Sequence, residues 1–200
     1  MTVAVSTDAP ILAGNSYTFD KQITLILGGN SSGKSSLLKS IAGTIDKEAW
    51  DLNQTLEPSF ITINNPDENI TYYISEHNLK SQMSHMSDNL GLHLASMKNS
   101  SGKATIIQVI AAIDSGNTII LDEPDQSLDI STINKLALLF FKVSFLQNKK
   151  LILVVHSKQL LDYISNFLTE RPKLAEEFRA IDIKTGLDTT ISTYIKEQLA

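Results

Sequence analysis

The sequence of 200 residues predicts an α/β fold in which a mostly parallel sheet is flanked by helices, with an antiparallel β edge and a short helical insert. Short apolar runs rich in β-branched residues, too short for helices, predict buried strands. Segments with helical spacing of apolar residues separate these runs, and a hairpin pattern stands at each end of the chain. Strands that alternate with helices indicate a parallel sheet covered on both faces.

The elements follow one another in a regular order. The first is a hairpin from Val3 to Phe19, with Ala13-Gly14-Asn15 as its turn. The predicted buried strands are Ile23 to Leu27, Phe60 to Ile63, Thr118 to Leu121 and Leu151 to Val155. The predicted helices are Lys34 to Ala42, Thr105 to Ile113, Ile130 to Leu146 and Gln159 to Leu168. The last element is a hairpin from Phe178 to Ile183 and Thr189 to Tyr194, with Lys184-Thr185-Gly186 as its turn.

We expect residues 1–200 to form one domain, because compact domains usually contain about 100 to 200 residues. Residues 66–100 differ from the rest in being polar, with helical patches such as Ile70 to Leu79, and we interpret them as a reduced helical insert. Three histidines recur there every eight residues, but no cysteine or carboxylate cluster accompanies them, so we favour a polar surface over a metal site. These histidines are His77, His85 and His93.

Composition excludes several function classes. The net charge of -5 opposes an extended nucleic-acid footprint, which needs clustered Lys and Arg. The longest apolar stretches fall far short of the ~20 residues that span a bilayer. The first residues lack the pattern of a secretory signal, and cysteine is absent. We therefore expect a cytoplasmic protein, with the inner face of the membrane as a location to which it could bind peripherally.

A phosphate-binding loop is the strongest motif. It matches the pattern GxxxxGK[ST], follows the apolar strand that ends at Leu27, and opens a helix. Backbone N–H groups of such a loop, with the positive end of the helix dipole, bind phosphate oxygens. Lys34 is expected to reach the β- and γ-phosphates of ATP, and the Ser35 hydroxyl to ligate Mg²⁺. The expected nucleotide-binding residues of this loop are Gly28, Gly29, Asn30, Ser31, Ser32, Gly33, Lys34, Ser35 and Ser36.

A buried strand that ends in two acidic residues supplies the second half of the predicted site. Asp122 and Glu123 follow Thr118 to Leu121, at the carboxyl end of the strand, where ligands bind in open α/β sheets. We expect Asp122 to hold Mg²⁺ and Glu123 to act as the general base that activates water. Alone, such a strand end is common on protein surfaces, and it gains its meaning from the phosphate loop.

With these two motifs the chain resembles the ATP-binding cassette (ABC) ATPases, from the first strand to at least His156. The runs GGNSSGKSSLLKSIAG and IILDEPDQSLD are similar to that family's phosphate loop and acidic strand. The resemblance implies that Asp129 lies at a seam between two subunits. It also implies that His156, within Val154-Val155-His156-Ser157, contacts the γ-phosphate and helps to hold the attacking water.

The family's signature loop departs from its usual sequence. Asn99-Ser100-Ser101-Gly102-Lys103 stands in its place, and Ser and Gly are kept at the second and fourth positions. The resemblance implies that Ser100 and Gly102 cap the γ-phosphate of ATP held by a second subunit. Read without the family, the run Ser-Ser-Gly-Lys is a helix-capping loop.

Two further departures from the family concern the residue that contacts Mg²⁺ and the residue that stacks on the adenine ring. The family places a glutamine that contacts Mg²⁺ after the strand that follows the first helix, and here Asn64 or Asn65 stands after Phe60 to Ile63. Asn64 is the expected ligand because it carries the same amide on a shorter stem, but turn chemistry before a proline explains these residues equally well. No aromatic residue between Val3 and Pro10 can stack on adenine, so base preference is weakly specified.

The resemblance implies an ATPase that binds ATP and Mg²⁺ and dimerises head to tail, either as a homodimer or with a paired ABC subunit. We expect it to power a transporter through a membrane-spanning partner subunit. The alternative is a soluble ABC ATPase outside transport, acting in DNA maintenance, defence or regulation. A third hypothesis, a nucleotide-sensing module without turnover, is disfavoured because Lys34, Ser35, Asp122, Glu123 and His156 are all present.

Overall fold

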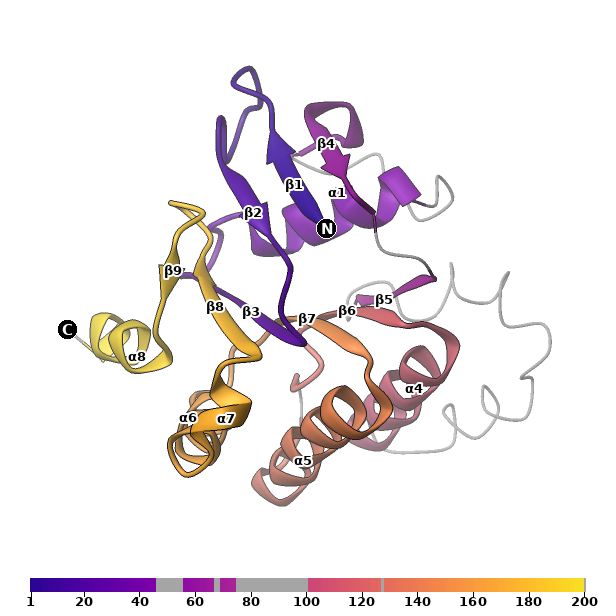
Figure 1. Ribbon diagram of the computed structural model, residues 1–200, viewed down its shortest axis with the longest axis vertical. Helices are drawn as coiled ribbons and strands as arrows, with labels where there is room; N and C mark the ends of the chain where they lie inside the picture. Colours follow the sequence, from indigo (N-terminus) through magenta and orange to yellow (C-terminus); the bar gives the residue numbers. More distant parts are fainter. Residues whose placement is uncertain (46–55, 67–68, 75–100, 127, 200) are drawn as a thin grey trace.

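The computed structural model describes residues 1–45, 56–66, 69–74, 101–126 and 128–199. Its centre is a six-stranded sheet in the order β5-β6-β7-β3-β8-β9 (Figure 1). The first five of these strands are parallel to one another, and β9 is antiparallel to β8 at the edge. The strands are β3 (Ile23–Leu27), β5 (Ile70–Ile74), β6 (Thr118–Asp122), β7 (Lys150–Val154), β8 (Phe178–Asp182) and β9 (Asp188–Thr189).

Both faces of this sheet are covered, because the central strands have buried and mostly apolar side chains on both of their sides. Leu25, Leu121 and Leu153 belong to a core cluster with residues of the helices on one face. Those helices are α4 (Ser101–Ser115), α5 (Ile130–Gln147) and α6 (Lys158–Thr169), joined by the short α7 (Pro172–Ala175) and by α8 (Ile191–Leu199). On the other face, Ile26 and Ile152 pack in a second cluster with residues of α1 (Lys34–Ile45). Burial on both faces explains the continuous apolar runs in the sequence.

A second, three-stranded antiparallel sheet lies beyond α1 in the order β2-β1-β4 (Figure 1). Its strands are β1 (Thr2–Val5), β2 (Ser16–Thr18) and β4 (Ile61–Asn64), with the 3-10 helix η2 (Pro58–Phe60) before β4. The predicted first hairpin is confirmed by the pairing of β1 with β2. The prediction that Phe60 to Ile63 forms a buried strand of the parallel sheet is wrong. The strand there pairs with β1, and exposure alternates along it because only one of its faces meets the core.

The structure corrects two further expectations. Residues 70–74 form β5, whereas we expected a helical patch from Ile70 to Leu79; the rest of that segment lies outside the described residues. The predicted last hairpin is confirmed in β8 and β9, but its second arm continues as α8. Thr190 caps this helix, since its hydroxyl accepts from the Thr193 N–H at 3.1 Å.

The other predicted elements are confirmed. The strands at residues 23–27, 118–121 and 151–155 are β3, β6 and β7, and the predicted helices are the cores of α1, α4, α5 and α6. No helix in the described part of the chain combines the length and the apolar character that a membrane span requires.

Candidate functional site

The carboxyl ends of three neighbouring strands bring together the phosphate loop, the acidic pair and His156. In the order β6-β7-β3, the acidic pair follows β6, His156 follows β7, and the phosphate loop follows β3. The register aligns these ends, because Val154 of β7 is paired with Asp122 on one side and with Ile26 on the other. Residues far apart in the sequence therefore meet at the carboxyl ends of parallel strands, where α/β folds bind ligands.

The phosphate loop is held in a conformation that needs glycine at two positions. Gly33 has φ +97°, in the left-handed region that favours glycine. A Cβ atom on Gly28 would lie 2.3 Å from Cγ2 of Ile183, which follows β8. The loop leads directly into α1. The backbone N–H of Leu37 in this helix donates to the carbonyl oxygen of Gly33 in the loop at 2.9 Å. The free N–H groups at the start of this helix are suited to bind an anion.

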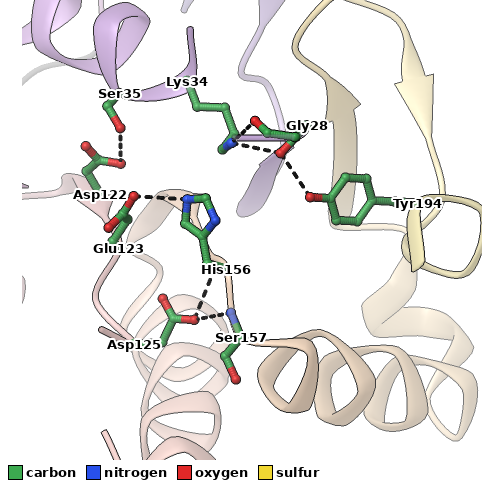
Figure 2. A network of polar contacts seen from close by, with 10 residues as sticks. Gly28, Lys34, Ser35, Asp122, Glu123, Asp125, His156, Ser157 and Tyr194 are labelled. Atoms are coloured by element: carbon green, nitrogen blue, oxygen red, sulfur yellow. Dashed lines mark hydrogen bonds and ion pairs between the residues drawn. The ribbon is translucent and has the colours of Figure 1, made fainter. Parts of the chain in front are cut away.

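Lys34 lies inside the loop rather than in solvent. Its side chain is 4% exposed, and its Nζ donates to the backbone oxygens of Gly28 and Gly29, each at 2.8 Å (Figure 2). Burial lowers the pKa of Lys34, and the carboxylates of Asp122 and Glu123 oppose that shift. An approaching anion stabilises a cation that has been desolvated in this way, so Lys34 is suited to bind a phosphate.

The oxygen donors expected to hold Mg²⁺ lie together. The Ser35 hydroxyl donates to Oδ1 of Asp122 at 3.1 Å, and Asp122 is buried. A hydroxyl and a carboxylate are hard oxygen ligands of the kind that Mg²⁺ prefers, so these two residues fit the ion. Within the described residues, Ser32 Oγ is buried without a hydrogen-bond partner. That orphaned group suits a phosphate oxygen at the same loop.

Glu123 and His156 face each other across the site. Glu123 Oε1 lies 3.0 Å from His156 Nε2, and the two side chains are 25% and 35% exposed (Figure 2). The Glu123 backbone has φ +54°, an uncommon value for a residue other than glycine, and its N–H donates to Val154 O at 2.9 Å. The residue is thus fixed by the neighbouring strand in a strained conformation, as is frequent at functional sites.

Asp125 is hydrogen-bonded to the backbone of the segment that carries His156. Its Oδ2 accepts from the backbone N–H of Ser157 at 2.7 Å and from that of His156 at 3.2 Å (Figure 2). The side chain is 6% exposed, and its Oδ1 is buried without a partner among the described residues. Burial raises the pKa of Asp125, while the hydrogen bonds from Ser157 and His156 lower it in part. Asp125 therefore fixes the segment that carries His156.

Asn64 lies in the antiparallel sheet, whereas the metal prediction assumed a strand of the parallel sheet. Asn64 ends β4 and pairs with Thr2 in the antiparallel sheet. The strand beside β6 is β5, in which Ile74 is paired with Asp122. The strand assumption was wrong because the sequence does not reveal which of the two consecutive strands joins the parallel sheet, and the metal role of Asn64 stays a prediction.

The residues predicted to meet a second subunit are placed in part. Ser100 lies outside the described residues, and Gly102 is in the first turn of α4. Asp129 is exposed and caps α5, since its Oδ1 accepts from the Thr132 N–H at 3.0 Å and its Oδ2 from the Thr132 hydroxyl at 2.8 Å. These hydrogen bonds lower the pKa of Asp129. Its position at a subunit seam stays a prediction.

The sequence missed two residues at this site, Asp125 and Tyr194. The Tyr194 hydroxyl donates to Gly28 O at 2.9 Å (Figure 2). Thr190 as a helix cap, with Ile191, Tyr194 and Ile195 at helical spacing, is a signal that could have predicted α8. No signal in one sequence distinguishes Asp125 from a solvent-exposed loop residue, because its burial depends on the loop after β7.

Comparison with known proteins supports the fold. No family model matches the chain. Among solved structures, it is similar to a chain from the inward-facing structure of a transporter assigned to the metal-chelate type of ABC transporters. The TM-score is 0.55 with 16% sequence identity, over 90% of this chain and 76% of that chain. At this identity the likeness shows architecture and not activity. The chain therefore has a mixed α/β fold, similar to that of the solved chain, with a mostly parallel sheet flanked by helices.

Proposed function

We propose that this chain binds Mg-ATP at the phosphate loop and hydrolyses it. One observation carries the proposal: the ends of three adjacent strands bring Lys34, the Ser35 and Asp122 pair, and the Glu123 and His156 pair to the same edge of the sheet. Each group matches a separate requirement of phosphoryl transfer, namely phosphate binding, metal binding and activation of water. The similarity to an ABC transporter chain is consistent with this function.

Binding begins at Lys34. When a nucleotide enters, Nζ exchanges its bonds to Gly28 O and Gly29 O for the β- and γ-phosphate oxygens. The N–H groups at the start of α1 and the Ser32 hydroxyl bind further phosphate oxygens. Ser35 and Asp122 would hold Mg²⁺ through their oxygens. When bound, the ion would supply positive charge that neutralises the phosphate oxygens.

Hydrolysis uses the second pair of residues. Glu123 accepts a proton from a water molecule while the water oxygen forms its bond to the γ-phosphorus and the bond to ADP breaks. His156, whose Nε2 lies 3.0 Å from Glu123 Oε1, helps in this proposal to hold that water and the γ-phosphate in line. Lys34 stabilises the negative charge that develops on the transferred group. The products are ADP and inorganic phosphate.

We further propose that two copies, or this chain and a paired subunit, close head to tail over ATP. In that arrangement Ser100 and Gly102 of one subunit cap the γ-phosphate bound by the other, and Asp129 lies at the seam. A membrane-spanning transporter partner would use the motion, which the similarity to a transporter chain supports. The competing function is a soluble ATPase in DNA maintenance, defence or regulation.

Binding and turnover are tested on the purified chain with Mg²⁺ and radiolabelled ATP. Equilibrium dialysis measures bound ATP, and release of labelled phosphate measures hydrolysis. Lys34→Met is expected to lose binding, whereas Glu123→Gln is expected to keep binding and to lose at least about 100-fold in turnover. Glu176→Gln makes the same chemical change at an exposed position outside the site and serves as the control.

Three results would count against the proposal. If the wild-type chain binds no ATP at millimolar concentration, the nucleotide site is refuted. If it binds ATP but releases phosphate no faster than Glu123→Gln, alone and with its copurified partner, the enzymatic function is refuted. If tagged Glu123→Gln, trapped with ATP, retains nucleic acid or a soluble protein instead of a membrane protein, the transporter role is replaced by the soluble alternative.

A further inference from the structure

Tyr194 connects the last helix of the described chain to the first residue of the phosphate loop. Its hydroxyl donates to the Gly28 carbonyl oxygen at 2.9 Å (Figure 2). Helix α8 is anchored, because Ile191 is buried in the core and Tyr194 and Ile195 pack against the same cluster. Burial, with the Asp182 carboxylate nearby, raises the pKa of Tyr194, so the phenol keeps the proton that it donates.

The Gly28 carbonyl is shared by two donors. Lys34 Nζ donates to the same oxygen at 2.8 Å, in a buried position. If Lys34 turns toward a phosphate, as the proposed function requires, this oxygen loses one donor while it stays inside the protein. A buried carbonyl left without any donor costs considerable free energy. Tyr194 is the group that can prevent this.

We propose that Tyr194 is a positioning residue of the phosphate loop, which holds the Gly28 carbonyl in place when Lys34 leaves it for a bound nucleotide. The peptide unit is planar, so a fixed Gly28 carbonyl also fixes the direction of the Gly29 N–H on the opposite side of that unit. The first peptide of the loop is thus kept in one orientation before and after phosphate binds. This inference rests on the proposed nucleotide binding.

Tyr17 offers a matched control. Its hydroxyl donates to the Ile183 carbonyl at 2.6 Å, and its side chain is fully buried. Tyr17→Phe therefore removes a buried hydrogen bond of the same chemical kind, between a phenol and a backbone carbonyl, without removing a donor from the loop. Any effect that comes only from losing a tyrosine hydroxyl near the sheet should be seen in both variants.

The first experiment measures the affinity for a fluorescent ATP analogue with Mg²⁺, in wild type, Tyr194→Phe and Tyr17→Phe. Tyr194→Phe is expected to weaken binding about 5- to 30-fold, which corresponds to about 1 to 2 kcal/mol at 1.4 kcal/mol per tenfold. Tyr17→Phe is expected to change it less than about twofold. Equal affinities for wild type and Tyr194→Phe, or equal losses in both variants, would overturn the proposal.

The second experiment needs no nucleotide. Thermal unfolding is measured for wild type, Tyr194→Phe, Lys34→Met and the double variant. Among the described residues, each single change leaves Gly28 O with one donor and the double change leaves none, so the double variant should lose more in Tm than the two single losses added together. Additive losses would refute the shared carbonyl. Wild type that binds no nucleotide would refute the proposed function, while this cycle still decides whether Tyr194 and Lys34 hold the same oxygen.

Discussion

Replacing Asp125 tests whether one buried carboxylate fixes the segment that carries His156. Asp125→Ala removes the acceptor of two backbone N–H groups, those of Ser157 and His156, at 2.7 and 3.2 Å. An unsatisfied buried N–H costs about 1 to 3 kcal/mol. Removing the carboxylate also recovers part of its own desolvation penalty, since the side chain is 6% exposed and Oδ1 has no partner in the described part of the chain.

The net expectation is a loss of about 2 kcal/mol in the free energy of unfolding for Asp125→Ala. In a domain of this size, each kcal/mol lowers Tm by roughly 2 to 4 °C, so Tm should fall by about 4 to 8 °C. Asp125→Asn keeps an oxygen that can accept from the same N–H groups, and it should lose less than about 1 kcal/mol. Turnover of ATP should fall about tenfold in Asp125→Ala and recover most of that loss in Asp125→Asn.

Calorimetry and urea unfolding measure stability, and phosphate release measures turnover. Asp114→Ala, which removes an exposed carboxylate, is the control and should stay within about 0.5 kcal/mol of wild type. The His156→Ala background separates positioning from stability, because Asp125→Ala should not slow turnover further when His156 is absent. An unchanged Tm in Asp125→Ala, or Asp125→Asn as unstable as Asp125→Ala, would refute the hydrogen-bonding role.

Three further predictions concern the loop and two carboxylates. Gly28→Ala should lose about 1 to 3 kcal/mol of stability, because its Cβ would lie 2.3 Å from Ile183 Cγ2, whereas Gly29→Ala meets nothing within 4 Å and should lose less; equal urea midpoints would contradict this. The raised pKa of Asp125 means that wild type loses part of its stability as pH rises through the folded-state pKa of this carboxyl, because ionising a buried carboxyl is costly, although the hydrogen bonds from Ser157 and His156 remain. Asp125→Asn should therefore gain stability relative to wild type as pH rises from 4 to 8, and a constant difference in Tm would exclude this. The lowered pKa of Asp129 has the opposite sign: its stabilisation of α5 is present above the unfolded-state pKa and is lost as pH falls through the folded-state pKa. The difference in Tm between wild type and Asp129→Ala should then shrink in acid, which unfolding at pH 7 and pH 2.5 will check.

The elements that the sequence predicted well have a strong local signal. Ile23 to Leu27 is apolar apart from Thr24 and is followed by a glycine-rich loop, so strand, loop and helix follow from local rules. The strand at Phe60 to Ile63 was assigned to the wrong sheet, because a short apolar run does not encode its pairing partner. β5 was taken for a helix, because Ile70 to Ile74 is short and lies in a polar segment.

The sequence alone predicted the phosphate loop and the acidic pair, since the spacing of glycines, a lysine and strand-end carboxylates reflects chemistry that needs those residues in that order, and the resemblance to ABC ATPases added His156. Only the tertiary structure decided their arrangement. Glu123 and His156 meet because β6 and β7 are paired in register, and Tyr194 reaches Gly28 because α8 follows β9, on the opposite side of β3 from the acidic strand. Such contacts join residues distant in sequence, and they depend on strand order and helix packing, which no local pattern encodes.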